Sequence, residues 1–125
     1  MRLQIVAIAD RGVPNKERLH LKAIVDLDLA YVVVLRSRYL GPTNVSANSL
    51  PAFWFPPRQV RMGDSIILYT GAGPVTQEAS GDGTTNYFYH WGFPQTIFHD
   101  PEACVVVVDV NSWQTSARAG ATPNQ

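Results

Sequence analysis

The chain is poor in several features that would assign it to a familiar class. Its 125 residues include one cysteine, Cys104, so it has no internal disulfide framework, and this residue is expected to be a small buried hydrophobe. Ten basic and ten acidic residues cancel to a formal net charge of zero, which argues against nucleic acid or an anionic membrane as the principal partner. No apolar run approaches the roughly 20 residues needed to cross a bilayer. The composition therefore indicates no clear nucleic-acid footprint and no membrane span.

The N-terminal sequence MRLQIVAIAD also lacks the small-residue cleavage pattern of a secretory signal. Its short apolar stretch ends at Asp10 and Arg11. We therefore expect a soluble protein that is intracellular by default.

Alternation of side chains is the clearest local signal that the chain does contain. From residue 18, the sequence RLHLKA alternates polar and apolar residues, which predicts a strand with one wet face and one buried face. The polar set is Arg18, His20 and Lys22, and the apolar set is Leu19, Leu21 and Ala23.

Turn signals separate about seven segments with strand character. The expected strands lie at residues 3–9, 18–25, 30–39, 53–55, 65–70, 87–91 and 103–110. Because no segment has a 3.6-residue apolar period, we expect an all-β protein, a two-sheet antiparallel β-sandwich. Residues 1–113 are predicted to form this single domain, and residues 114–125 a flexible C-terminal tail. The polar stretch from 71 to 86 is predicted to be a long loop.

Several short motifs are informative as an ordered set. They are Glu17, Leu19 and Leu21 at the opening of a strand, the pair Phe55-Pro56, the turn Met62-Gly63-Asp64, the strand from Ile66 to Gly71 that ends Tyr69-Thr70-Gly71, Trp91, the pair Ile97-Phe98, and the strand that closes at Val108-Asp109. In this order they resemble the lamin tail domain, an immunoglobulin-like sandwich found at the end of nuclear lamins and in many bacterial proteins. The resemblance implies an immunoglobulin-like fold, a buried Trp91, and an interaction module for protein, nucleic-acid or membrane-associated partners.

The same strands are expected to share one core. Its predicted members are Phe55, Ile66 or its neighbour Ile67, Tyr69, Val106 and Val108. Because Phe53 and Phe55 lie on one face of a short strand, Trp54 takes the other face and is expected to be exposed.

The three histidines invite catalytic and metal-binding interpretations. His20 alternates with leucines and is expected to be solvated, whereas His90 lies between two aromatic residues, where a packing role is favoured. His99 and Asp100 could form an oriented base, but adjacent side chains in a loop usually point apart. No histidine or cysteine pair has the HxxxH or CxxC form, and no dinucleotide fingerprint occurs, so we expect no metal and no cofactor.

Aromatic residues are better candidates for binding. Trp54, Tyr87 and Tyr89 are the candidate surface residues, because outward rings can anchor a protein or stack on a sugar or base. We expect a noncatalytic binding or assembly module, not an enzyme, that engages a protein partner or self-associates.

Two alternatives stay open. One is a small hydrolase that uses His99 and Asp100, and the other is a carbohydrate-binding sandwich, which requires coplanar exposed aromatic rings beside polar groups. The hydrolase gains support if two polar groups converge in a cleft from the set His20, His90, His99, Asp82 and Asp100.

Overall fold

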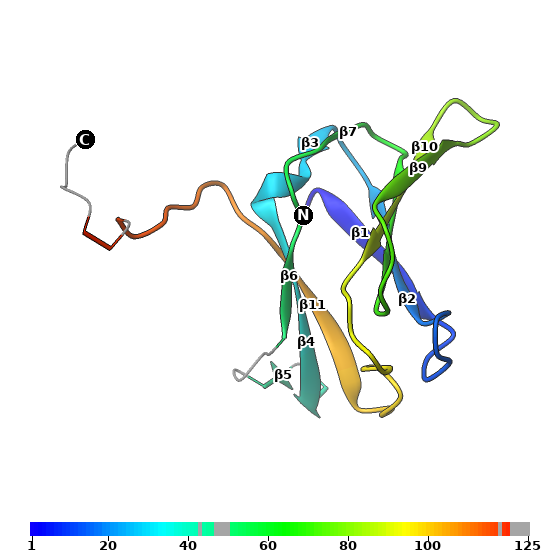
Figure 1. Ribbon diagram of the computed structural model, residues 1–125, viewed down its shortest axis with the longest axis vertical. Helices are drawn as coiled ribbons and strands as arrows, with labels where there is room; N and C mark the ends of the chain where they lie inside the picture. The colour runs from blue at the N-terminus through cyan, green and yellow to red at the C-terminus, as the bar shows by residue number, and fades with distance from the viewer. Residues whose placement is uncertain (43, 47–50, 118, 121–125) are drawn as a thin grey trace.

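The computed structural model describes residues 1–42, 44–46, 51–117 and 119–120. Within these ranges the regular elements are strands and one short 3-10 helix, η1 (Leu29–Tyr31). Two sheets form a sandwich (Figure 1), so the prediction of an all-β sandwich is confirmed. Its architecture is compatible with an immunoglobulin-like fold.

The first sheet has five strands. Their order across the sheet is β1 (Leu3–Ala9), β2 (Arg18–Ala23), β8 (Ser65–Tyr69), β10 (Thr85–His90) and β9 (Thr76–Ala79). Neighbours are antiparallel except for β8 and β10, which run parallel. This one parallel pair arises because the chain leaves β8, forms the edge strand β9, and returns beside β8 as β10.

Strand β9 corrects the prediction of a long loop from 71 to 86. Its sequence TQEA is exposed at every position, so it has none of the apolar alternation that marks a half-buried strand. Its pairing with β10, for example Gln77 with Tyr87, holds it in the sheet.

The second sheet is built on the long strand β4 (Val32–Gly41). Strand β11 (Ala103–Asp109) pairs with one side of β4, and β6 (Ala52–Trp54) and β5 (Asn44–Val45) pair with β4 as well. A further small pair, β3 (Leu27–Asp28) with β7 (Gln59–Val60), lies near the top of the sandwich in Figure 1.

The chain leaves the sandwich after Trp113, which still packs against Trp54. The described residues 114–117 and 119–120 belong to no sheet, and the C-terminal segment leads away from the body (Figure 1). The domain boundary at 113 and the flexible tail stay predictions. Residues 118 and 121–125 of that tail lie outside the described residues.

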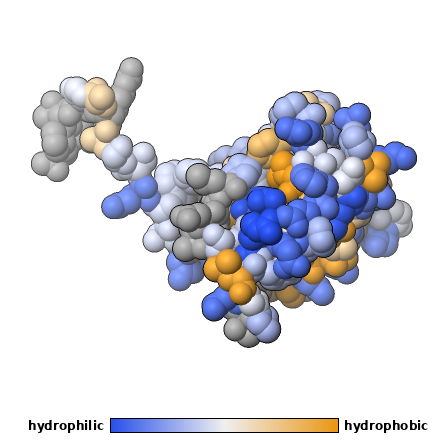
Figure 2. Space-filling view, turned by 90° about the horizontal axis from the view of Figure 1, so that it is seen from below, coloured by the Kyte–Doolittle hydropathy of each residue, from blue (hydrophilic) through white to orange (hydrophobic). Residues whose placement is uncertain are grey.

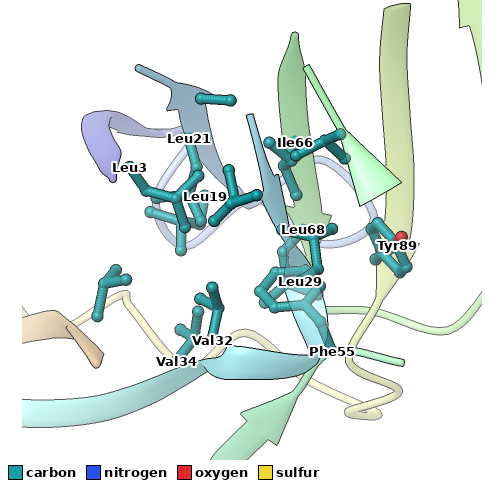
Figure 3. Packing of buried hydrophobic residues seen from close by; sticks show 14 residues of the cluster. Leu3, Leu19, Leu21, Leu29, Val32, Val34, Phe55, Ile66, Leu68 and Tyr89 are labelled. Atoms are coloured by element: carbon teal, nitrogen blue, oxygen red, sulfur yellow. The ribbon is translucent and has the colours of Figure 1, made fainter. Parts of the chain in front are cut away.

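Side chains from both sheets meet in one apolar core (Figure 3). Its most buried large members include Leu19, Leu21, Leu29, Val32, Val34, Phe55, Ile66, Leu68 and Tyr89. The predicted alternation in β2 is confirmed, since Leu19, Leu21 and Ala23 are buried and the intervening residues face outward.

The predicted core face of β11 is wrong by one residue. Val107 lies in the core and Val105 packs against it, whereas Val106 and Val108 are partly exposed on the opposite face. The run CVVVV has no alternation, so it carries no information on which face is buried. Pairing of Val107 with Val34 of β4 sets that choice.

Strand β8 confirms part of the core prediction and corrects another part. Ile66 is in the core with Phe55, but Tyr69 is partly exposed and lies on the outer face of the sheet. Ile67, which shares that outer face, is 9% exposed because neighbouring side chains cover it.

One buried carboxylate closes an end of the sandwich. Glu17, 1% exposed, accepts hydrogen bonds from the amide of Gly12 at 2.8 Å, the hydroxyl of Thr70 at 2.9 Å and the amide of Ile97 at 2.8 Å. The amide of Phe98 also donates to it, at 3.2 Å. The carboxylate thereby ties together three connecting segments that are far apart in the sequence.

Two arginines link the edge strands β1 and β11. The side chain of Arg2 donates to Asp109 through Nε at 3.0 Å, and Arg11 donates to the carbonyl of Ala103 at 3.0 Å. The hydrogen bonds from Arg2 lower the pKa of the Asp109 carboxyl below its ordinary value. The two contacts lie at opposite ends of β1, so they close this side of the sandwich without a strand ladder.

Truncation of β11 side chains tests which face is buried. We expect Val107→Ala to lower the free energy of unfolding by about 1–3 kcal/mol, because it leaves a cavity in the core. Val106→Ala, its neighbour on the outer face, should cost under about 1 kcal/mol. Urea denaturation of both variants measures the difference, and equal losses would contradict the assigned face.

Removal of the buried carboxylate tests its role in joining the segments. Glu17→Ala leaves buried amides and the Thr70 hydroxyl without their acceptor, so we expect a loss of about 2–5 kcal/mol in unfolding free energy. Glu78→Ala on the exposed strand β9 is the control, with a change within about 0.5 kcal/mol. A Glu17 variant as stable as this control in chemical denaturation would refute the role.

Candidate functional site

Trp54 lies on β6, at a border of the second sheet. Phe53 and Phe55 on either side of it turn into the sandwich, and the Trp54 side chain turns outward and is 50% exposed, as the alternation predicts. Its indole Nε1 donates a hydrogen bond to the carbonyl of Ala30 at 2.7 Å. This bond fixes the ring on the surface and leaves its apolar part available for contact.

A second tryptophan extends this surface. Trp113 packs perpendicular to Trp54, with ring centroids 4.8 Å apart and an interplanar angle of 87°, and it is 52% exposed. A groove of about 320 Å³ lies here, lined by Ala30, Trp54, Phe55, Pro56, Pro57 and Trp113. We call these six residues the tryptophan groove. The sequence analysis missed Trp113 because it follows the last strand and belongs to no alternating pattern, although its bulk stands out in the polar stretch NSWQTS.

Tyr89 is not a surface residue, so that prediction is wrong. It is 1% exposed and packs edge-on against Phe55, with ring centroids 5.0 Å apart. Burial raises the pKa of its hydroxyl. Three successive positions of β10 are aromatic, Tyr87, Phe88 and Tyr89, so its sequence did not distinguish the inner face from the outer one.

Tyr87 and Trp91 share the inner side of that sheet with Tyr89. Both are partly buried and pack against the core, and the guanidinium of Arg58 lies 5.5 Å from the centre of the Tyr87 ring. Tyr87 is therefore less available to a partner than Trp54. The expectation that Trp91 is buried holds in part, since it keeps some exposure.

Two of the histidines lie on the outer face of the first sheet. The Nε2 of His20 lies 3.2 Å from the hydroxyl of Ser65, and burial, with the nearby charges of Arg18 and Lys22, lowers the pKa of His20. His20 is thus partly buried, whereas the sequence analysis predicted that it is solvated.

His90 is held by its neighbours. Its ring stacks on Tyr69 with centroids 5.1 Å apart, and its Nδ1 lies 2.9 Å from the carbonyl of Pro74, to which it donates. Gly73 packs so closely that an added Cβ would lie 2.5 Å from the His90 Nε2. These contacts agree with the predicted packing role.

The carboxylate of Asp100 is bound by residues other than His99. One oxygen accepts from the Arg38 guanidinium and the other from the amide of Glu102 at 2.9 Å. The Glu102 amide and then Arg38 lower the pKa of Asp100. Both oxygens are therefore committed to partners other than the neighbouring imidazole.

The polar groups named for a hydrolase lie apart. His90 lines a cleft of about 400 Å³ beside β10, whereas His99 lines a separate cleft of about 320 Å³ beside Arg36. Asp82 lies in the turn before β10, where it accepts from the hydroxyl and amide of Thr84. Among the residues that the structure describes, no group of three or more His, Cys, Asp or Glu side chains is placed to hold a metal ion. In that same part of the chain, no helix is long and apolar enough to cross a membrane.

The exposed rings do not form a flat platform. Trp54 and Trp113 are perpendicular, and the Tyr69 ring stacks on His90 and has the guanidinium of Arg18 at 5.9 Å from its centre. Figure 2, a view from below, shows separate apolar patches within a largely hydrophilic surface. Carbohydrate stacking requires open, coplanar ring faces. Neither Trp54 with Trp113 nor Tyr69 with His90 supplies them.

Fold and surface together define an all-β sandwich with an exposed groove of two tryptophans. No protein-family model, no curated protein and no solved structure matches the chain.

His20 gives the sandwich a pH dependence. Its lowered pKa means that the folded chain takes up this proton less readily than the unfolded chain. The contribution of neutral His20 to the free energy of unfolding is therefore fully present above about pH 6.5. It is lost as the pH falls through the pKa of His20 in the folded chain. We expect His20→Gln to reduce the loss of unfolding free energy on acidification. Denaturation at a series of pH values measures this, and identical slopes in wild type and His20→Gln would count against it.

Proposed function

We propose that the chain is a noncatalytic binding or assembly module that engages a protein partner, or a second copy of itself, through the tryptophan groove. The observation that carries the proposal is the pair Trp54 and Trp113, each about half exposed and packed together over an apolar groove. Tryptophan is enriched among the residues that dominate binding energy at protein interfaces.

The groove is organised before any partner arrives. The bond from Trp54 to Ala30 and the packing of Trp113 restrict the Trp54 ring, and Pro56 and Pro57 stiffen the backbone beneath it. Ordering a side chain on binding costs roughly 0.5–1.5 kcal/mol, so a ring that is already ordered loses less of its contact energy.

The lamin tail resemblance belongs to the same proposal. Residues that carry it have structural roles here: Glu17 binds the Thr70 hydroxyl of the Tyr-Thr-Gly motif and the amide of Phe98, and Phe55 lies in the core. These roles support an immunoglobulin-like interaction sandwich in which the shared motifs build the core and one of them, Phe55-Pro56, also borders the tryptophan groove.

A catalytic alternative has weaker support. The hydrolase proposal needs Asp100 to orient His99, but Asp100 is bound to Arg38 and Glu102. The balanced charge of the chain likewise favours a protein partner over nucleic acid.

Replacement of one exposed aromatic residue tests the proposal. Trp54→Ala should weaken association by about 2 kcal/mol or more, because it removes an anchor from the groove. Tyr39→Ala on β4 is the matched control, since Tyr39 is 51% exposed at a different part of that sheet. Affinity capture from the native host and analytical ultracentrifugation give the readouts.

Three results are expected together. Trp54→Ala loses a partner or an oligomer that wild type forms, Tyr39→Ala keeps it, and circular dichroism shows both variants folded. Unchanged partners and an unchanged oligomeric state in Trp54→Ala would remove Trp54 from the proposal.

A further inference from the structure

The second sheet has an outer face that is as apolar as its inner face. The register places Val106 opposite Leu35 and Val108 opposite Val33 on this side. On the other side of β4, Trp54 lies opposite Val33 and Ala52 opposite Leu35. We call the six residues of these two rows the outer valine face: Val33, Leu35, Ala52, Trp54, Val106 and Val108.

This face offers a partner nothing but apolar contact. None of its six side chains is charged, and its one hydrogen-bonding group, the Trp54 indole, already donates to Ala30. A sheet that is apolar on both faces is the pattern of strands covered on both sides, whereas a strand with one wet face alternates as β2 does. The composition of β4 and β11 thus matches a covered face.

We propose that a second copy of this chain covers the outer valine face, in a twofold dimer whose two outer sheet faces pack against each other. The inference rests on the proposed function, because both use the surface at Trp54. A face without charge has no means of selecting a partner by charge complementarity, but it meets no repulsion from an identical face. The zero net charge of the chain also removes long-range repulsion between copies.

The shape of the face suits twofold packing. One row contains the large Trp54 with Val33, and the other contains the small Ala52 with Leu35. A twofold axis that reverses the strand direction sets the taller row of each copy against the lower row of the other. Sheets that pack in this aligned way lie about 10 Å apart, with side chains interdigitating.

The exposed apolar area of the outer valine face limits how strongly two copies can associate. Trp54 is about half exposed, and a fully buried aromatic side chain accounts for roughly 150–250 Å², so this ring offers roughly 75–125 Å² per copy. Even with the partly exposed aliphatic side chains, the dimer buries less than the roughly 1,200–2,000 Å² of stable interfaces. The dimer is therefore weak and exchanging, with a dissociation constant on the order of 0.1–1 mM.

Sedimentation velocity tests the dimer over chain concentrations from about 10 µM to about 1 mM, the range that brackets such a constant. Wild type should shift from monomer toward dimer, and added salt should not weaken the association, since no charges are paired. The double variant Val106→Thr with Val108→Thr keeps side-chain shape and strand preference, but it places hydroxyls that would be buried unpaired in the dimer. It should dimerise at least about tenfold more weakly.

Val75→Thr is the matched control. Val75 is 58% exposed and lies next to β9, far from the second sheet in the topology, so its replacement should leave the dissociation constant unchanged. Backbone amide shifts on dilution locate the contact independently: β4, β6 and β11 should move, and β1 and β9 should not.

Several outcomes would overturn the dimer. They are a monomer at every concentration, a threonine double variant that associates as tightly as wild type, and dilution shifts confined to the edge strands β1 and β9, which would indicate edge pairing. If the chain stays monomeric while Trp54→Ala still loses a captured protein, the dimer is wrong and the proposed function stands. If the chain stays monomeric and Trp54→Ala captures the same proteins as wild type, both the dimer and the proposed function are wrong.

Discussion

The architecture depends on the burial of one carboxylate. A charged group removed from water is tolerated only where hydrogen-bond donors surround it, and Glu17 receives donors from Gly12, Thr70, Ile97 and Phe98. Its backbone is bound as well, since the amide of Thr70 donates to the Glu17 carbonyl at 3.1 Å. The segment that leads from the first sheet to β11 is thereby fixed against the start of β2 and the end of β8. The path of the chain between the two sheets follows from that attachment.

The position of β11 has opposite consequences on its two faces. Once Val107 pairs with Val34 and turns inward, alternation forces Val106 and Val108 outward, onto the side where Trp54 emerges from β6. The buried face of β11 completes the core, and its other face becomes part of an uncharged surface. Core packing and the candidate interface are therefore two results of one strand register.

Prediction from sequence succeeded where polar and apolar residues alternate and failed where they do not. The alternation in β2 and around Trp54 assigned faces correctly, because each position differs in kind from the next. The runs CVVVV and TNYFYHW offer no such contrast, so Val106 was placed in the core and Tyr89 on the surface. Glu17 was noted only as an acidic residue that opens a strand. Its partners Thr70 and Phe98 are 53 and 81 residues away, and only the folded chain brings them to it.

Several polar groups are hydrogen-bonded within the chain, which leaves mainly apolar surface for a partner to contact. Asp100 is bound to Arg38, His90 to the Pro74 carbonyl, and the Trp54 indole to Ala30, so each of these groups is already paired. A general base or a metal ligand needs a lone pair directed at substrate, whereas an interface needs apolar area in a fixed shape. The perpendicular tryptophans and the rows beside them supply the second requirement. In the proposed interface, association would therefore draw its free energy from buried apolar area, and its selectivity would come from shape and not from charge.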